Sequence, residues 1–268
     1  MSIVPNDITA ISYNQDASVV QANELVRSKQ DDLTLLEAKL LRLAISQVLK
    51  EDTDLKTYSC SITDLAKFLK ITPDNVYRDI QSIGNTFMRK CIFISSHNDT
   101  NTNEPNYKIY HWISSFEYNN GIITFKLSDE IKPYLIGLDK LFTMYPYHAI
   151  LTLPTSYSIR FYELMASYER LYFKEHIDTY HDIPIEQNEI VFTIEQLREF
   201  FNCIDKYPNT GKFIDRVIDP SIEAVLKHAN MYITYRTITK GKKITHIVFK
   251  KISAVDYYLD KIRTQKNQ

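Results

Sequence analysis

The same pattern of polar and apolar positions occurs twice in this chain. It runs through Ser61–Leu69 and again through Thr193–Phe201, and the two stretches align without a gap. In each copy a Ser or Thr stands three residues before an Asp or Gln, which is the spacing of a capping box at the start of a helix. Three apolar residues then fall on one face of that helix.

Similar elements surround both copies. A strand-like run precedes each one (Tyr58–Cys60 and Ile190–Phe192), and a long amphipathic helix lies further upstream (Leu33–Leu49 and Ser156–Phe173). A second helix and a hairpin follow. The order helix, strand, helix, helix, hairpin is typical of a winged helix-turn-helix. The sequence therefore predicts an α+β fold with two tandem winged helix-turn-helix domains, an arrangement suited to reading DNA.

In the first half, Thr72-Pro73 predicts the start of the second helix, because proline is favoured in a first helical turn. The opposite face from its apolar line is polar and gives candidate DNA contacts: Asn75, Arg78, Gln81 and Asn85. A solvated helix face without a ligand is an equal alternative. Strands are expected at Cys91–Ser95, Lys108–Tyr118 and Ile122–Leu127. The polar segment His97–Asn106 is interpreted as a long wing tip, and Asn119-Asn120-Gly121 as a tight hairpin turn.

In the second half, the second helix begins near Asn209 and Thr210, and we expect Pro220 to bend it. Lys212, Asp215, Arg216 and Asp219 fall opposite its apolar line. The candidate DNA contacts of this helix are Asn209, Thr210, Lys212, Asp215 and Arg216. Arg216 is the first candidate for contact with a base edge, because a guanidinium can bond both acceptors of a guanine.

The chain closes with two β-rich runs, Met231–Thr239 and Ile244–Lys250. Three lysines crowd the turn between them, Lys240, Lys242 and Lys243, and this placement suits contact with phosphates. The alternative is that these lysines only protect a hairpin edge from pairing with other strands.

Residues 1–19 are polar and aperiodic, so we interpret them as a flexible N-terminal arm. The first winged-helix domain is placed at 20–146 and the second at 147–252. Residues 253–268 are interpreted as a basic C-terminal tail.

Charge supports a polyanionic partner. The 268 residues carry a net charge of −1, but Asp205 to Gln268 hold 13 Lys/Arg and 6 Asp/Glu, a net charge of +7. The remainder of the chain therefore carries −8. Such an asymmetry indicates a basic face that contacts polyanions such as double-stranded DNA. The alternative is a solvated basic tail, which is our interpretation of Lys261–Lys266.

Other classes of protein fit poorly. The chain has no apolar run of about 20 residues and no signal-peptide core, so we expect a cytoplasmic protein without a membrane partner. Its 3 cysteines lack metal spacing, and its 5 glycines form no phosphate-binding loop, so no cofactor or metal is expected. The acidic-histidine cluster matches no metal signature: His176, Asp178, His181 and Asp182. No His-x-His motif of a nicking endonuclease occurs, and we expect no enzymatic activity.

Several stretches resemble one family, the iteron-binding plasmid replication initiators of the RepA/RepE class. They are Asn23-Glu24-Leu25, the Leu33–Leu49 helix, Ile131–Leu135, "YSIRFYEL" from Tyr157 and "RVIDPSI" from Arg216. The resemblance extends from Gln21 to Lys251. It implies two winged-helix domains related by pseudo-twofold symmetry, with Lys212–Leu226 reading the major groove.

The resemblance also implies a function. Monomers would bind directly repeated origin sequences (iterons) and recruit the host initiator and replicative helicase. A homodimer in equilibrium with the monomer would bind an operator and repress the initiator's own gene, using the first-domain wing region to dimerise. A winged-helix transcriptional repressor without a replication role is the alternative.

The strands of the first domain are rich in aromatic residues: Tyr110, Trp112, Phe116 and Phe125. Aromatic residues are enriched in interface cores, so these rings are candidates for a dimer interface. The alternative is that they pack internally against the Leu33–Leu49 helix.

Overall fold

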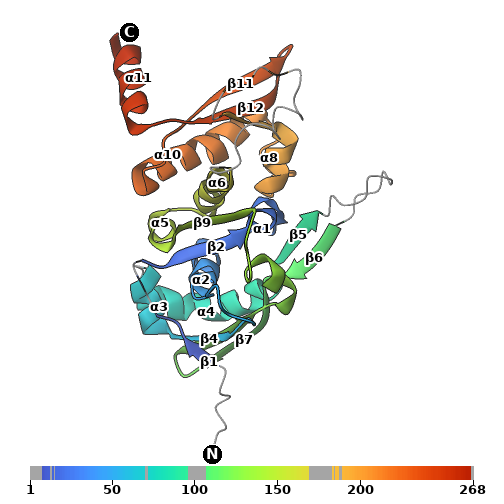
Figure 1. Cartoon of the computed structure of the whole chain (residues 1–268), viewed down its shortest axis with the longest axis vertical. Helices are drawn as coiled ribbons and strands as arrows, with labels where there is room; N and C mark the ends of the chain where they lie inside the picture. The colour runs from blue at the N-terminus through green and yellow to red at the C-terminus, as the bar shows by residue number, and fades with distance from the viewer. Residues whose placement is uncertain are drawn as a thin grey trace, which may run out of the picture. The chain divides into compact units, whose positions relative to one another are not determined.

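The computed structural model describes residues 8–266 except 13, 15, 70–71, 96–106, 169–182, 184 and 187–188. It divides into two compact units, Met1–Thr152 and Leu153–Gln268 (Figure 1). Each unit combines helices and strands, as the sequence predicts. The two units are described separately below.

The central helix of the first unit is α2 (Leu35–Ile45). Thr34 and Glu37 form a capping box, in which each side chain accepts from the other residue's backbone N–H. Nine of the helix's 11 residues are buried. The sequence predicts that this helix continues to Leu49, but it ends at Ile45. The Ser46 hydroxyl donates to the Leu43 carbonyl there, which satisfies one of the carbonyls left over at the helix end.

The winged helix of the first unit has the predicted order of elements. Its members are β4 (Thr57–Ser61), α3 (Ile62–Leu69), α4 (Pro73–Phe87), β7 (Ile113–Asn119) and β8 (Ile122–Leu127). The strands form a sheet in the order β1-β4-β8-β7, in which the short β1 (Ile8–Ala10) pairs parallel to β4. Ser61 accepts from the Asp64 backbone N–H at 3.0 Å, so the first copy of the repeat begins a helix as predicted.

The assignment of the wing tip in this unit was wrong. The segment 97–106 lies outside the described residues, but the strands on either side of it, β5 (Cys91–Ser95) and β6 (Tyr107–His111), do not belong to the winged-helix sheet. β5 pairs with β3 (Lys29–Gln30) on one side and with β6 on the other, in another sheet. The wing is instead the β7–β8 hairpin, whose turn contains Asn120 and Gly121, both with positive φ. The polar composition of 97–106 suggested a wing, but the pairing of β7 with β8 in the winged-helix sheet identifies their hairpin as the wing.

The remaining elements of the first unit are α1, a short helix η1, a two-stranded sheet and α5. Their bounds are β2 (Ser18–Ala22), α1 (Asn23–Arg27), the 3-10 helix η1 (Asp129–Tyr134), β9 (Phe142–Pro146) and α5 (Tyr147–Thr152). β2 pairs with β9 across more than a hundred residues of chain. The N-terminal segment expected as a flexible arm thus contributes β1 and the start of β2 to the fold.

The second unit repeats the plan. Its elements are α6 (Ser156–Ser167), β10 (Glu189–Thr193), α8 (Ile194–Phe200), α9 (Thr210–Phe213), the π-helical turn η2 (Ile214–Ile218), α10 (Asp219–Ala229), β11 (Ile233–Lys240) and β12 (Lys243–Lys251). The sheet order β10-β12-β11 matches β4-β8-β7 of the first unit. Thr193 and Gln196 form the predicted capping box. The repeat in the sequence therefore corresponds to two winged helices.

Aromatic side chains fill the core of the second unit. Phe249 on β12 lies with its ring centroid 5.4 Å from Phe161 of α6 and 6.1 Å from Phe192 of β10. Phe201 contacts Phe213 at 6.4 Å, and this contact joins the end of α8 to the following helix. Burying rings of this size is the main force holding the helices to the sheet.

The C-terminal segment, expected as a basic tail, contains a helix. Helix α11 spans Ala254–Lys266 and begins at Ser253, whose hydroxyl oxygen accepts from the Asp256 backbone N–H at 3.1 Å. Tyr257 packs on Tyr232 with ring centroids 5.4 Å apart.

Candidate nucleic-acid interface

The predicted recognition helix of the second unit starts at a polar cap. The Asn209 side-chain oxygen accepts from the Lys212 backbone N–H at 3.2 Å, so Asn209 ends the preceding turn and starts α9. Phe213, Ile214 and Val217 are buried. Lys212, Asp215 and Arg216 are exposed. The structure therefore places the predicted candidates on the first turns of one helix, with their side chains away from the core.

The helix is continuous through Pro220, but it contains a wide turn. The Asp219 N–H donates to the Ile214 carbonyl, five residues earlier, and this bond defines the π-helical turn η2. Proline lacks an N–H, and its ring conflicts with a normal α-helical turn. Widening the preceding turn accommodates Pro220 in the first turn of α10. The expected bend is thus a change in helical winding that includes Arg216.

Arg198 of α8 holds the turn that leads into this helix. Its guanidinium donates to the carbonyls of Cys203 (3.2 Å), Lys206 (2.8 Å) and Tyr207 (2.6 Å). It also lies 4.9 Å from the ring centroid of Phe213. Bonds from one charged group to three carbonyls fix the path of the backbone between the two helices.

The wing of the second unit carries three exposed lysines on a tight turn. Lys240 and Lys243 form the last pair of the β11–β12 ladder, and Gly241 has φ +63, where a side chain would be strained. Lys243 Nζ lies 3.9 Å from a carboxylate oxygen of Glu195, with both side chains 72% exposed. No ion pair joins Lys240 or Lys242 to another of the described residues.

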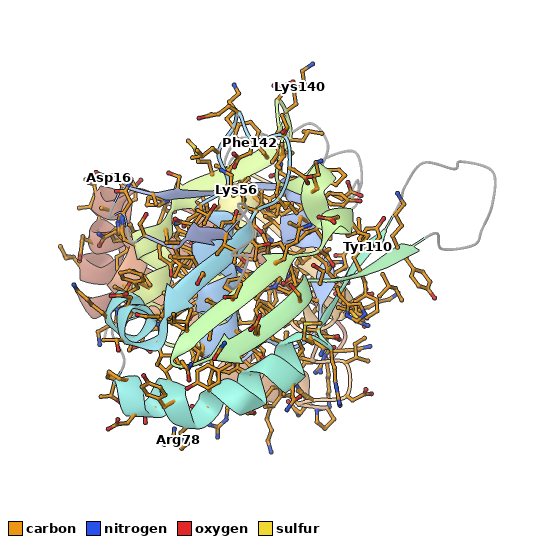
Figure 2. All side chains as sticks on the ribbon, turned by 90° about the horizontal axis from the view of Figure 1, so that it is seen from below. Asp16, Lys56, Arg78, Tyr110, Lys140 and Phe142 are labelled. Carbon is orange, nitrogen blue, oxygen red and sulfur yellow. The ribbon has the colours of Figure 1, made fainter. Side chains whose placement is uncertain are left out.

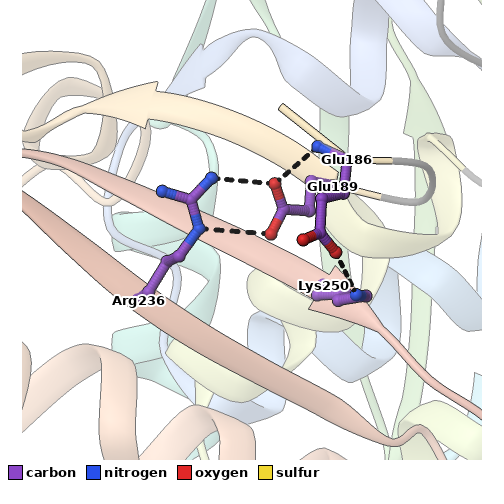
Figure 3. Close-up of polar contacts among 4 residues, drawn as sticks. All are labelled: Glu186, Glu189, Arg236 and Lys250. Atoms are coloured by element: carbon purple, nitrogen blue, oxygen red, sulfur yellow. Dashed lines mark hydrogen bonds and ion pairs between the residues drawn. The ribbon is translucent and has the colours of Figure 1, made fainter. Parts of the chain in front are cut away.

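Two other cations of the second unit, on strands β11 and β12, are paired with carboxylates. Arg236 forms two bonds with Glu189, of 3.2 and 2.9 Å, and Lys250 lies 2.7 Å from Glu186 (Figure 3). Burial alone would raise the pKa of Glu189, but the hydrogen bond from Arg236 lowers it below its usual value. Arg236 and Lys250 are therefore less suited to contacting a polyanion than the wing lysines.

The corresponding surface of the first unit is close to neutral. Arg78, on the side of α4 away from the sheet (Figure 2), donates to Asp79 at 2.9 Å, and each group shifts the pKa of the other toward its charged form. Asn75 and Asn85 are exposed, and the side chain of Gln81 lies outside the described part. The wing tip near Gly121 carries no charge; a Cβ built there would lie 3.2 Å from the Tyr77 hydroxyl.

Two of the four aromatic side chains proposed for a dimer interface are buried inside the first unit. Trp112 and Phe125 are fully buried, and the guanidinium of Arg42 on α2 lies 5.9 Å from the Trp112 ring. Phe116 approaches α4 so closely that a Cβ on Gly84 would lie 2.8 Å from its ring. Internal packing thus accounts for Trp112 and Phe125 and for the side of Phe116 that faces α4, while Phe116 and Tyr110 on β6 are both half-buried.

The residues of the acidic-histidine cluster at 176–182 lie outside the described part of the chain. Within the described part, no group of three or more His, Cys, Asp or Glu residues is arranged to hold a metal. No helix there has the length and apolarity to cross a membrane.

Comparison with known proteins identifies the family. The model of the family described as "Initiator Replication protein, WH1" matches residues 18–166, more than half of the chain. The model "Initiator Rep protein, WH2" matches residues 193–250. The chain belongs to the initiator replication protein family. Its two winged helices are the WH1 and WH2 domains of that family.

A solved structure of an initiator protein shares the fold. The crystal structure of the Pi initiator protein in complex with iteron DNA aligns over 90% of this chain and 100% of that chain, with a TM-score of 0.62 and 18% identity. The structure of RctB domains 2–3 aligns over 84% of this chain and 83% of that chain, with a TM-score of 0.40 and 9% identity.

Two residues of WH2 position the site and were missed by sequence reasoning. Arg198 aligns with Ala66 in the repeat, and the turn it holds is longer than its counterpart in WH1. The longer turn could have indicated, from the sequence alone, that a side chain is needed to hold it. Tyr235 on β11 donates to Asp219 Oδ1 at 2.7 Å, and no pattern in the sequence indicates that contact.

Proposed function

We propose that this initiator binds directly repeated sequences in duplex DNA at a plasmid origin. The WH2 helix from Asn209 to Ala229 would enter the major groove, with Lys212 and Arg216 facing the DNA. The supporting observation is that both cations are exposed on the first turns of a capped helix and have no ion pair with any described residue. The iteron complex of the Pi protein, which shares the fold, agrees with this proposal.

The WH2 wing would contact phosphates through Lys240, Lys242 and Lys243, and WH1 would contribute weaker contacts through its neutral α4 surface. Affinity therefore depends mainly on WH2. The mechanism is binding without bond-making chemistry: the protein would destabilise an adjacent AT-rich segment and recruit the host initiator and replicative helicase. The family resemblance supports these partners.

The proposal includes a homodimer that represses the initiator's own gene. Since Trp112, Phe116 and Phe125 pack internally, the strand that supports dimerisation is β6. It lies at the edge of its sheet among the described strands, with Tyr107 and Ile109 exposed. Such an edge can pair with the same strand of a second copy.

Sedimentation of Ile109→Lys tests the dimer, because a charge on β6 should shift the protein toward monomer. The matched control is Ile122→Lys, a change at another exposed isoleucine, on β8, a strand with partners on both sides. A wild-type protein that stays monomeric at micromolar concentration, or equal effects of the two changes, would contradict the dimer on β6.

The initiator is distinguished from a simple repressor by strand opening. The full-length protein is first used to select duplexes from random-sequence DNA. The selected sequence is then cloned as direct repeats beside an AT-rich segment. Permanganate reactivity then reports unpaired thymines. An initiator should raise reactivity in the AT-rich segment, whereas a repressor should bind the repeats and leave it paired. Failure to select any sequence would contradict both functions.

A further inference from the structure

The hydrogen bond between Tyr235 and Asp219 joins the wing to the recognition helix. Tyr235 lies on β11, and its hydroxyl donates to Asp219 Oδ1 at 2.7 Å, while Asp219 begins α10 directly after the π-helical turn. The ring of Tyr235 lies 6.2 Å from that of Phe249 in the core. The contact thus anchors one carboxylate oxygen of the recognition helix to the sheet.

This carboxylate has an alternative partner. Arg216 stands three residues before Asp219, and opposite charges at that spacing on a helix attract each other. In the structure Arg216 forms no ion pair with Asp219 or with any other described residue, while Asp219 accepts from Tyr235. An Arg216–Asp219 pair would occupy the guanidinium that a guanine edge requires.

We infer that Tyr235 is a positioning residue for sequence reading: its hydroxyl holds the Asp219 carboxylate, so that Arg216 remains available to contact a base. This inference rests on the proposed binding of DNA by the WH2 helix. It explains why an acidic residue can lie so near the base-reading guanidinium without neutralising it.

The surroundings of Tyr235 keep its hydroxyl a donor. Burial raises the pKa of Tyr235, and the hydrogen bond to Asp219 and the nearby Asp215 carboxylate raise it further. The phenol therefore stays protonated at any pH at which the protein binds DNA. Losing the oxygen alone, as in Tyr235→Phe, leaves the ring and its packing in place.

The test measures discrimination by full-length variants, defined as the ratio of the Kd for a scrambled duplex to the Kd for a duplex selected by the wild type. Tyr235→Phe should lower this ratio by about two- to fivefold, the factor by which an exposed ion pair shifts an equilibrium. Tyr235→Phe combined with Asp219→Asn should restore the ratio, because a neutral amide does not compete for Arg216. Asp219→Asn alone should stay near the wild-type value.

The matched control is Tyr232→Phe, which removes a hydroxyl just before the same strand, where the ring packs on Tyr257 and Tyr258 of α11. It should leave discrimination unchanged. The double variant distinguishes two explanations for a loss of discrimination in Tyr235→Phe. If the loss comes from the released Asp219 carboxylate, adding Asp219→Asn restores the ratio, whereas a generally loosened helix would not be repaired by a second substitution. Thermal unfolding of each variant confirms that it is folded.

Each result has one reading. If Tyr235→Phe keeps full discrimination, or if Asp219→Asn fails to restore it, the inference is wrong while the proposed function stands. If the wild type selects no duplex and binds all sequences equally, the proposed function itself fails.

Discussion

Removing the wing lysines should reduce the salt dependence of DNA binding. Each lysine that neutralises a phosphate releases counterions and contributes about 0.9 to the slope of log Kobs against log salt. Lys240 and Lys242 have no ion pair among the described residues, so Lys240→Ala with Lys242→Ala should lower the slope by about 1.8. Between 50 and 200 mM salt, the variant should then lose about tenfold less affinity than the wild type.

Lys243 makes the prediction sharper, because its charge is partly balanced by Glu195 at 3.9 Å. Lys243→Ala should change the slope by less than either other lysine. Conversely, Glu195→Gln should raise the slope by releasing Lys243, although both side chains are well exposed and the change will be less than about 0.9. Gly241 is retained in every variant, so the turn keeps its backbone conformation.

The assay is fluorescence anisotropy with a labelled duplex at several salt concentrations, on both selected and scrambled sequences. The lysine variants should weaken binding to both duplexes alike, because phosphate contacts carry no sequence information. An unchanged slope in the Lys240 and Lys242 double variant would refute the assignment of the wing to phosphate binding. It would leave these lysines as protection for the hairpin edge.

Three further predictions concern Arg216, the support that Arg198 gives to its helix, and the Arg236–Glu189 pair of the sheet. Arg216→Ala should reduce discrimination between selected and scrambled duplexes by about 1–3 kcal/mol. If competition binding shows that affinity for both duplexes falls equally, Arg216 contacts the DNA phosphate backbone and not a base. Arg198→Met should lower the free energy of unfolding, measured by urea denaturation, by about 2–3 kcal/mol, because the hydrogen bonds to three carbonyls are lost. Arg198→Lys should recover only part of this stability. A full recovery would show that the several N–H groups of the planar guanidinium are not required. The pKa of Glu189 in the folded protein is lower than its ordinary value of 4.5. Pairing with Arg236 therefore stabilises the folded state fully at pH values above 4.5, and this stabilisation is lost as the pH falls through the lowered pKa. Thermal unfolding from about pH 6 to about pH 3 should therefore show a smaller acid-induced loss for Arg236→Met than for the wild type, and identical curves would contradict this account.

Local signals in the sequence predicted most of the winged-helix elements. The boxes at Thr34 and Thr193 and the cap at Ser61 fix helix starts within one turn, and their chemistry is contained in four consecutive residues. Strands β5 and β8 were predicted with the bounds that the structure shows. Alternation of apolar residues was sufficient there, because one side of each strand is largely buried.

Pairing between distant segments could not be predicted in the same way. The polar segment 97–106 suggested a wing, but the strand before it, β5, pairs with β3 about sixty residues earlier in the chain. β1 joins β4 from within the presumed arm, and no local pattern reports that partnership. The aromatic strands showed the same limit, since composition cannot tell whether Trp112 faces α2 or a second copy of the chain.

The candidate site was predicted in part. Lys212 and Arg216 follow from helical periodicity, and the structure shows both exposed on the predicted helix. Their supports depend on tertiary contacts: Arg198 reaches three carbonyls beyond its own helix, and Tyr235 reaches Asp219 from a different element. The π-helical turn before Pro220 likewise changes the direction of side chains in a way that a regular helical projection misses.

The most direct test of the central claim is a hydroxyl-radical footprint of the full-length protein on its selected duplex. Two winged helices that each place a helix in a major groove predict two protected regions on one face of the duplex, about 34–36 Å or one helical turn apart. Combining Lys212→Ala with Arg216→Ala should weaken the protected region that belongs to WH2 more than the region that belongs to WH1. A footprint without sequence preference, or protection unaffected by those two substitutions, would contradict the account.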